Sequence, residues 1–364
     1  MDQVGIEFAY GGLRLSAVSH ERIPVVTALQ SFSVSSDLEV PDALKGFVAR
    51  TGLKGAPTTY SVPSDLATLH WTKLPRVSRA ELGEIAQFKL REHFSRPMED
   101  MALGVVPFEL VGDDQIEALV IAVPKEIVAS RAQLIDRAGL EPVACEIEAQ
   151  SLIRIAQREM AAVGSMFRQM SMTIIDLGAE RTRFVVVQNR RVQFIRTVKF
   201  GSNRLVSLVA SALEVSQDQA QFYVDQRSTS IDTDLQLRLD FDGELRLVDV
   251  TPAMESLFKE LRRLITYFRT LRSDRSYRGL MERLILSGDL VSTRGFPETV
   301  GKTIGIRTQE LNPLHGARIS IDAPDLTPLA SSPHRFTIAL GLALSPYSNP
   351  LEVDAYGHTR IEAA

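Results

Sequence analysis

One strand–acid–turn–strand pattern occurs twice in this chain and constrains its fold more than any other feature. The first copy runs from Gly5 to Val18 and the second from Ile174 to Val187. In each copy an apolar strand leads to an acid, Glu7 or Asp176, before a small polar turn and a second apolar strand. Each copy then turns again into a third strand. Two such units can face each other across a cleft and hold a polyphosphate between their turns, which indicates a nucleotide-cradling fold.

The composition is that of a globular protein and argues against several classes of partner. The 364 residues are enough for two domains, and the net charge of -4 disfavours a general nucleic-acid grip. Cys145 is the one cysteine, so no internal disulfide can form, and we expect this side chain to be a small buried apolar group. Since no apolar run approaches ~20 residues and no signal peptide is apparent, we expect a cytoplasmic protein without direct membrane insertion.

Common catalytic signatures do not occur in the sequence. The six histidines show no metal-ligand spacing, and there is neither an HExxH nor a CxxC motif. No GxSxG motif and no Walker A loop is present, which disfavours a serine hydrolase and a P-loop ATPase.

Between the first copy and mid-chain, the apolar pattern predicts a compact α+β insert of roughly 100 residues. Ser78 begins a helix with Glu81 at the capping-box position, and Gly139 ends another helix as its C-cap. The predicted elements are a helix over 38–51, strands over 58–63 and 69–75, a helix over 78–94, strands over 102–110 and 116–123 joined by a turn at 112–114, and a helix over 125–137.

The rest of the chain alternates strands and helices around the second copy. A polar tail over 347–364 closes it, and we expect this tail to be loose. The predicted elements are a strand over 140–148, a helix over 149–163, helices over 203–213 and 216–225, a hairpin over 235–248, a helix over 252–271, a strand over 283–287, a helix over 295–303, a strand over 307–311 and a final helix over 335–344.

The order of these features resembles a known family. The duplicated units, the strand that leads into Gly288 and Asp289, and the final apolar helix look like the actin-like ATPase superfamily. More narrowly, the chain resembles the type IV pilus assembly protein PilM family, which is related to FtsA, over about residues 4–344. The residues that carry the resemblance, in the family's order, are Leu74-Pro75, Glu81-Leu82, the stretches 121–127 and 138–148, Asp176 to Ala179, and Phe200-Gly201.

The resemblance implies an α/β fold of the actin-like, ribonuclease H-like kind. Two duplicated subdomains would sandwich a nucleotide, and an FtsA-type α+β subdomain would be inserted in the first. The implied division is 1–34 for the first part of subdomain 1A, 35–140 for the inserted subdomain 1C, 141–202 for the second part of 1A with the hairpin that starts the second half, 203–330 for subdomains 2A and 2B, 331–346 for a closing helix and 347–364 for a flexible tail.

The resemblance also implies a function. Members of the family bind the cytoplasmic N-terminal peptide of the inner-membrane protein PilN in a groove beside the insert. We therefore expect a cytoplasmic scaffold of type IV pilus or related secretion assembly, peripheral to the inner membrane through a PilN-like partner, with homo-oligomers left open. Candidate groove residues are Trp71, Leu74, Phe88 and Phe94, most of which also suit a core.

In the second turn, the residue types suit a phosphate loop of the kind that the resemblance implies. Asp176 would face Mg²⁺ through water, because a hard cation on a polyphosphate prefers oxygen ligands. Gly178 has no side chain, so its backbone could approach a phosphate, and Arg181 or Thr182 could add a contact. An ordinary hairpin with an acid at its turn is the alternative interpretation.

The first turn departs from the Asp-Ile-Gly that is usual in the family. Glu7 is longer than aspartate by one methylene, and Ala9 and Tyr10 place side chains where backbone should meet phosphate. A relic turn is the alternative to a nucleotide contact here. The residues that could still contact a nucleotide are Glu7, Gly11, Gly12 and Arg14.

The nucleoside side of the implied site is also altered. Gly288 could still support a base, whereas Asp289 brings negative charge toward the phosphates in place of a glycine. The long helix carries polar residues in the region that holds ribose and base in actin-like folds, although a solvated helix face explains them equally well. These residues are Lys259, Glu260 and Arg263.

Glu146 and Glu148 come at the end of a predicted strand, near the place where actin-like enzymes position the attacking water. Alternation along a strand would put both on one face, and either could act as a base. A structural role is the alternative for both.

The departures at Ala9, Tyr10 and Asp289 lead us to expect that ATP with Mg²⁺ binds weakly or not at all, with negligible turnover. An actin-superfamily small-molecule kinase is one alternative function, but it needs an intact first glycine turn and a dedicated base. An FtsA-like filament-forming protein is another. The tail over 347–364 is acidic and not amphipathic, which argues against direct membrane anchoring.

Overall fold

The computed structural model of the chain describes residues 2–19, 21–34, 36–93, 96–111, 114–163, 172–188, 191–271, 281, 283–320, 332–345, 352–354 and 359–360. Its contacts group the chain into two compact units. Unit 1 comprises residues 1–154, 316–326 and 338–364, and unit 2 comprises residues 155–315 and 327–337. Each unit contains one copy of the duplicated hairpin.

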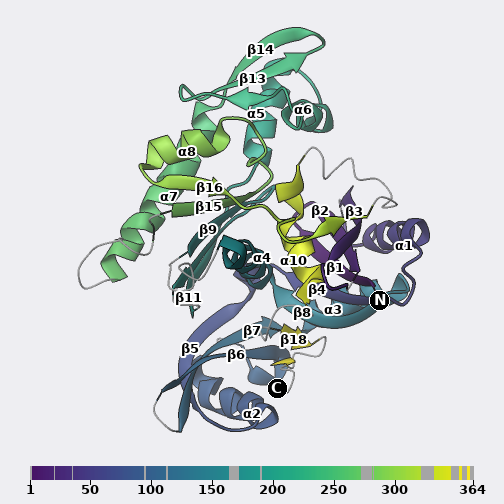
Figure 1. The fold of residues 1–364 in the computed structure, drawn as a ribbon, viewed down its shortest axis with the longest axis vertical. Coiled ribbons are helices and arrows are strands. Elements are labelled where there is room, and N and C mark those ends of the chain that lie inside the picture. The colour runs from purple at the N-terminus through teal and green to yellow at the C-terminus, as the bar shows by residue number, and fades with distance from the viewer. Residues whose placement is uncertain are drawn as a thin grey trace. The chain divides into compact units, whose positions relative to one another are not determined.

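Unit 1 is built on an eight-stranded sheet with the order β17-β3-β2-β1-β4-β8-β18-β19 (Figure 1). Strands β1 (Asp2–Ala9), β2 (Gly12–Ser19) and β3 (Val25–Ser33) form an antiparallel meander. Strands β4 (Pro57–Val62) and β8 (Glu141–Ile147) then continue the sheet parallel to β1. The short strands at its ends are β17 (Arg318–Ile319), β18 (Glu352–Asp354) and β19 (Thr359–Arg360).

Helices bury both faces of β1, which explains why its residues are apolar or small. On the face of Phe8 lie α1 (Val40–Thr51) and α3 (Lys125–Arg137), and the guanidinium of Arg131 stands 4.8 Å from the centre of the Phe8 ring. On the other face, α10 (Thr337–Ala343) passes so close that a Cβ on Gly5 would lie 2.1 Å from the Ala339 carbonyl oxygen. Glu7 shares this second face with Gly5 because side chains alternate along a strand.

The insert is a separate three-stranded sheet, β5 (Thr68–Pro75), β7 (Gln115–Pro124) and β6 (Met101–Val111), covered by α2 (Arg79–Leu90). As predicted, α2 begins with a capping box, in which the Ser78 N–H donates to Glu81 at 3.0 Å. Within the predicted insert of 35–140, β4 joins the large sheet and α3 packs on β8. Parts of the turn predicted at 112–114 and of the helix end predicted at 94 lie outside the described residues.

Unit 2 repeats the strand pattern of unit 1 in a five-stranded sheet with the order β11-β10-β9-β15-β16 (Figure 1). Strands β9 (Met172–Leu177), β10 (Thr182–Gln188) and β11 (Arg191–Val198) are antiparallel. Strands β15 (Arg283–Gly288) and β16 (Arg307–Glu310) continue the sheet parallel to β9. The topology therefore matches β3-β2-β1-β4-β8, and the duplication seen in the sequence is a duplication of the fold.

The rest of unit 2 forms one apolar core with this sheet. Helix α7 (Thr251–Leu271) buries an apolar stripe that includes Met254, Leu257 and Leu261. The hairpin of β13 (Gln236–Phe241) and β14 (Glu244–Asp249) turns at Asp242 and Gly243, both with positive φ, and β12 (Ser230–Ile231) completes its small sheet. The remaining elements are α5 (Asn203–Leu213), α6 (Gln217–Val224), α8 (Phe296–Ile304) and the 3₁₀ helix η5 (Pro333–Phe336).

Candidate functional site

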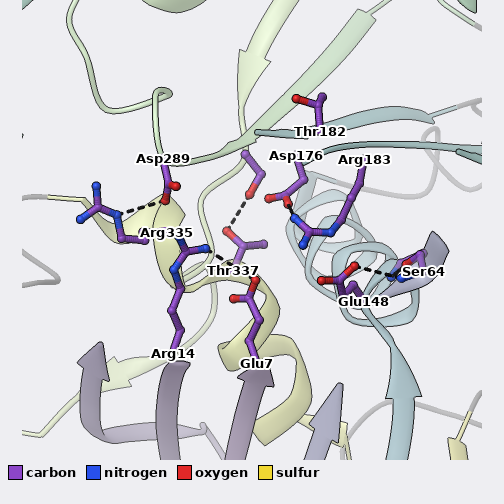
Figure 2. A network of polar contacts seen from close by, with 12 residues as sticks. Glu7, Arg14, Ser64, Glu148, Asp176, Thr182, Arg183, Asp289, Arg335 and Thr337 are labelled. Atoms are coloured by element: carbon purple, nitrogen blue, oxygen red, sulfur yellow. Dashed lines mark hydrogen bonds and ion pairs between the residues drawn. The ribbon is translucent and has the colours of Figure 1, made fainter. Parts of the chain in front are cut away.

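The turn between β9 and β10 holds a buried ion pair rather than an open carboxylate. The antiparallel register places Arg183 directly opposite Asp176. The Nη1 atom of Arg183 donates to Asp176 Oδ2 at 2.7 Å (Figure 2), and both residues are almost fully buried. Asp176 therefore has a guanidinium as its neighbour at the position where the sequence predicted a hydrated metal ion.

Gly178 makes room for this arginine. A Cβ on Gly178 would lie 2.9 Å from Arg183 Nη1 and 3.1 Å from the Arg181 carbonyl oxygen. The Gly178 N–H, expected to face a phosphate, donates to that Arg181 carbonyl at 2.9 Å. A glycine at this position therefore lets the Arg183 side chain approach the backbone closely. This is a structural reason for the glycine, separate from its suitability for a phosphate loop.

The same turn is braced by the segment that leads into α5. The Ser202 and Asn203 N–H groups donate to the carbonyls of Gly178 and Ala179 at 3.0 and 2.9 Å. Thr182 is buried, and its hydroxyl donates to the Phe200 carbonyl at 2.9 Å. The carbonyl groups of the turn and the Thr182 hydroxyl are therefore engaged within unit 2.

The first hairpin, in unit 1, also has an ion pair between an acid and the arginine opposite it on the next strand. Arg14 lies directly opposite Glu7, with 3.5 Å between Arg14 Nη1 and Glu7 Oε1 (Figure 2). Tyr10 and Gly11 form a two-residue turn closed by the pairing of Ala9 with Gly12, and Gly11 has a φ of 78°. The turn therefore runs from strand to strand without a wider loop that could surround a phosphate.

Gly11 and Gly12 also border a hollow inside unit 1. It measures about 410 Å³ and is lined by the β1–β2 turn together with residues of α1 and α3. Arg131 of α3 lines it while donating to the Ser61 carbonyl at 2.6 Å. This hollow adjoins Phe8, on the face of the sheet opposite to Glu7.

Gly288 and Asp289 are held by contacts within unit 2. Gly288 has a φ of 102°, and a Cβ there would lie 2.2 Å from the Leu177 carbonyl oxygen, so its backbone packs against β9. Asp289 accepts from Arg335 Nε at 3.1 Å (Figure 2). It also accepts from Ser202 Oγ at 3.1 Å. Arg335 also donates to both carboxylate oxygens of Asp225, at 2.7 and 3.0 Å. Burial alone would lower the pKa of Arg335, but these two carboxylates raise it above its ordinary value.

The polar residues of α7 form a solvated face. Lys259 and Arg263 are exposed, and Arg263 lies 3.9 Å from Glu260 one helical turn away. A pair at this spacing and exposure is a common helix-surface contact.

Glu146 and Glu148 do not share the face of one strand. Strand β8 ends at Ile147, and Glu148 is the first residue of α4 (Glu148–Val163). The alternation of side chains along a strand therefore does not apply to Glu148. Glu146 is buried and accepts from both terminal nitrogens of Arg154, at 2.7 and 3.0 Å. Glu148 is buried as well and accepts from the Ser64 N–H at 3.1 Å (Figure 2). These contacts describe structural roles within unit 1.

The junction between the insert and β8 is the second candidate region. Strand β18 pairs with β8 in antiparallel fashion at Ala144 and Cys145, and it also contacts β6. A hollow of about 20 Å³ at this junction is lined by apolar residues such as Val62, Ala102 and Ile121. Of the candidate groove residues, Trp71 and Phe88 are exposed, Leu74 belongs to the insert core, and Phe94 lies outside the described residues.

The Arg183 guanidinium beside Asp176 does not suit a magnesium ion at that carboxylate. Two unit charges 4 Å apart interact by about 4 kcal/mol at an effective dielectric of ~20, so a divalent ion beside the Arg183 guanidinium would meet roughly twice that repulsion. Among the described residues, no group of three or more His, Cys, Asp or Glu side chains could hold a metal ion.

The arginines of these pairs are what the sequence interpretation missed. Arg183, Arg335 and Arg154 were given no role, although a signal for the first was present. In both copies the basic residue follows the acid by seven positions (14 − 7 and 183 − 176), which matches the register of a hairpin. A repeated acid and base at that spacing indicates a cross-strand ion pair.

Comparisons with known proteins agree with this architecture. A family model described as type IV pilus assembly protein PilM matches residues 103–347. A structure described as a PilM-PilN type IV pilus biogenesis complex is similar with a TM-score of 0.74 and 19% identity, over 95% of this chain and 99% of that chain. The ethanolamine utilization protein EutJ from Carboxydothermus hydrogenoformans is similar with a TM-score of 0.50 and 13% identity, over 94% of this chain and 89% of that chain.

The fold is therefore actin-like, as the sequence predicted. In the part of the chain that the structure describes, no helix combines the length and the apolar character needed to cross a bilayer.

Proposed function

The chain belongs to the type IV pilus assembly protein PilM family, and we propose that it acts as a scaffold that binds an extended peptide of a PilN-like inner-membrane partner. The observation that carries the proposal is the family match combined with the likeness, along nearly the whole of both chains, to a PilM-PilN complex. In this proposal the protein is cytoplasmic and lies at the inner membrane through its partner.

The junction of β8 with the insert is where we place the peptide. An extended segment can bind there by adding a strand to the sheet, because β18 does so in antiparallel register with Ala144 and Cys145. The apolar hollow beside it, at about 20 Å³, is too small to enclose a large side chain, so main-chain pairing along β8 would provide most of the contact. Without a paired strand, β8 would present an edge that proteins usually protect.

Two exposed aromatic residues on the insert support a partner surface. Trp71 of β5 is 41% exposed and Phe88 of α2 is 85% exposed. Exposed aromatic side chains of this size are enriched at the centres of protein interfaces. We therefore assign the insert to the partner side of the scaffold.

ATP with Mg²⁺ is at most a weak ligand in this proposal, and turnover is negligible. The support is that the acids considered for metal or base roles, Glu7, Asp176 and Glu146, each lie beside an arginine of the same unit. The same pairings give no support to a small-molecule kinase, which would need a carboxylate available as a base.

Peptide binding tests the proposal directly. A labelled peptide with the cytoplasmic N-terminal sequence of a PilN-like membrane protein is titrated with the full chain, and fluorescence anisotropy is recorded. We expect saturable binding in the micromolar range, about −8 kcal/mol, that weakens about tenfold in Trp71→Ala and Phe88→Ala. Phe222→Ala is the matched control, because Phe222 is also exposed, at 61%, but belongs to unit 2.

A tail variant distinguishes the β8 edge from other surfaces. Val353→Pro removes the backbone N–H of a residue that pairs with Cys145, so β18 should pair less well. If the partner peptide adds to the same edge, this variant should bind it several-fold more tightly than the parent chain. Equal affinity would move the peptide to another surface, and absence of binding in all folded variants would refute the proposed partner.

A further inference from the structure

Both copies of the hairpin, and the turn after β15, pair an acid with an arginine. The pairs are Glu7 with Arg14 in unit 1, and Asp176 with Arg183 and Asp289 with Arg335 in unit 2. These acids are the ones that the sequence placed closest to a metal or a phosphate. The disagreement between that expectation and the observed partners is strongest at Asp176, where the pair is shortest and most buried.

Arg183 fits the turn in shape as well as in charge. Its Nη1 atom reaches Asp176 and lies where a Cβ on Gly178 would come within 2.9 Å. The guanidinium therefore covers the glycine that would have admitted a phosphate and neutralises the carboxylate that would have attracted a metal. A planar guanidinium donates in fixed directions and stays charged at all physiological pH values, so it can hold a carboxylate permanently.

We propose that Arg183 is a built-in counter-ion whose charge replaces that of a metal ion and whose guanidinium fills the space beside Gly178 that a phosphate would need, so that the turn keeps one geometry without nucleotide. The consequence for partner binding rests on the proposed function: the scaffold would present its partner surface at all times rather than only when ATP is bound. Ser202 connects this turn to the turn after β15, because its N–H donates to the Gly178 carbonyl and its hydroxyl donates to Asp289.

The first hairpin supports the proposal independently. Arg14 takes the same cross-strand position opposite Glu7 in a unit with a different core and a different turn. An arginine at one copy could be a local accident of packing. Its presence at both copies, in the same register, indicates that an internal cation is part of how this hairpin is stabilised in the chain.

The experiment compares metal binding in four forms of the full chain. The probe is Mn²⁺ with ATP, followed by the paramagnetic signal of the ion and by calorimetry. Arg183→Gln removes the internal cation while keeping a side chain of similar length. Arg183→Lys retains the positive charge, and Asp176→Asn/Arg183→Gln removes both partners so that no carboxylate is exposed.

We expect the parent chain and Arg183→Lys to bind Mn²⁺ with ATP only at millimolar levels. Arg183→Gln should bind it at least about tenfold more tightly, and the double variant should lose that gain. If Arg183→Gln folds and binds Mn²⁺ with ATP no more tightly than the parent chain, the proposal is wrong.

A second measurement keeps the test decisive if Arg183→Gln fails to fold. The melting temperature of the parent chain is measured with and without millimolar Mg²⁺ and ATP, because a ligand that binds the folded state raises it. No shift supports the proposal, and a shift of several degrees refutes it. Partner-peptide binding is read separately, so its failure would refute the proposed function and leave the result for Arg183 standing.

Discussion

The two copies of the hairpin share a register but differ in how tightly they hold their ion pairs. In unit 2, Arg183 Nη1 lies 2.7 Å from Asp176, whereas in unit 1 Arg14 Nη1 lies 3.5 Å from Glu7. The residue two positions after the acid also differs, Gly178 in unit 2 and Ala9 in unit 1. Ala9 is the last residue of β1, whereas Gly178 follows the end of β9 at Leu177.

We expect the small residue at this position to set how closely the arginine approaches the acid. At Gly178 the arginine can lie against the backbone and form a buried, hydrogen-bonded pair. Unit 1 has Ala9 at the corresponding sequence position, and the contact between Arg14 Nη1 and Glu7 Oε1 is longer there, at 3.5 Å. We expect the two pairs to contribute unequally to stability, and the predictions below test that inequality.

The largest effect is expected from Arg183→Gln. It leaves Asp176 buried without its guanidinium, which for a buried pair costs about 3–5 kcal/mol of unfolding free energy. Hydrogen exchange of the β9 and β10 amides reports this unit, and urea unfolding gives the total. Asp176→Asn/Arg183→Gln should recover most of the loss, because removing both charges leaves no buried ion. A loss of unfolding free energy below about 1 kcal/mol would show that the short Arg183–Asp176 ion pair contributes little to stability.

A reciprocal exchange of the small residues should come next. Gly178→Ala places a methyl 2.9 Å from Arg183 Nη1 and 3.1 Å from a carbonyl oxygen, which should cost about 1–3 kcal/mol as overpacking. Ala9→Gly should let Arg14 approach Glu7 and change stability much less. Urea unfolding of both variants and a crystal structure of Gly178→Ala measure this. If Gly178→Ala leaves the Arg183 position unchanged, the steric account of the difference is wrong.

Arg14→Gln should have a smaller effect than Arg183→Gln. Its contact to Glu7 is longer and the Arg14 side chain is 11% exposed, so we expect a loss of about 1 kcal/mol, nearer to a surface pair than to a buried one. The single tryptophan, Trp71, lies in the insert of unit 1, so its fluorescence can follow unfolding of this unit. A loss equal to that of Arg183→Gln would remove the distinction between the two copies.

Most of the fold could be predicted from the sequence because its signals are local. Alternation identified the hairpins, and the Ser78–Glu81 pair marked a helix start that the structure confirms. The predicted C-cap at Gly139 is one residue late, since α3 ends at Arg137 with Ala138 as its C-cap and Gly139 follows with a φ of 84°. The partners of the strands within the predicted insert could not be predicted, because strand pairing is not local. Nothing in residues 57–62 says that β4 pairs with β1 and β8 rather than with β5.

The candidate site could be predicted only in part, for a physical reason. Residue type identifies Asp176 and Gly178 as suitable for a phosphate loop, but the partner of a carboxylate depends on which side chain lies opposite it. Arg183 becomes that partner only through the β9–β10 register, and Arg335 reaches Asp289 from a distant part of unit 2. Glu148 was misplaced for a related reason, since β8 ends one residue earlier than the apolar pattern suggests.

The smallest expected effect is a pH dependence of the stability of unit 1, which contains Cys145. Burial raises the pKa of the Cys145 thiol to about 12, although Arg131 and Tyr60 oppose the shift. In the unfolded chain a thiol titrates near pH ~8.5. A group whose folded pKa is raised contributes fully below the unfolded pKa, and this contribution is lost as the pH rises toward the folded value. Stability should therefore fall between about pH 8.5 and pH 12.

At pH 9 the loss from Cys145 should stay below about 1 kcal/mol, because only part of the unfolded thiol is ionised there. Cys145→Ala should remove this alkaline slope in unfolding followed by Trp71 fluorescence. Hydrogen exchange of β9 and β10 should show no such slope from Cys145, since the one cysteine belongs to unit 1. An equal slope in both units would mean that they unfold together, and the stability differences between the two hairpins would then have to be read from double-variant cycles alone.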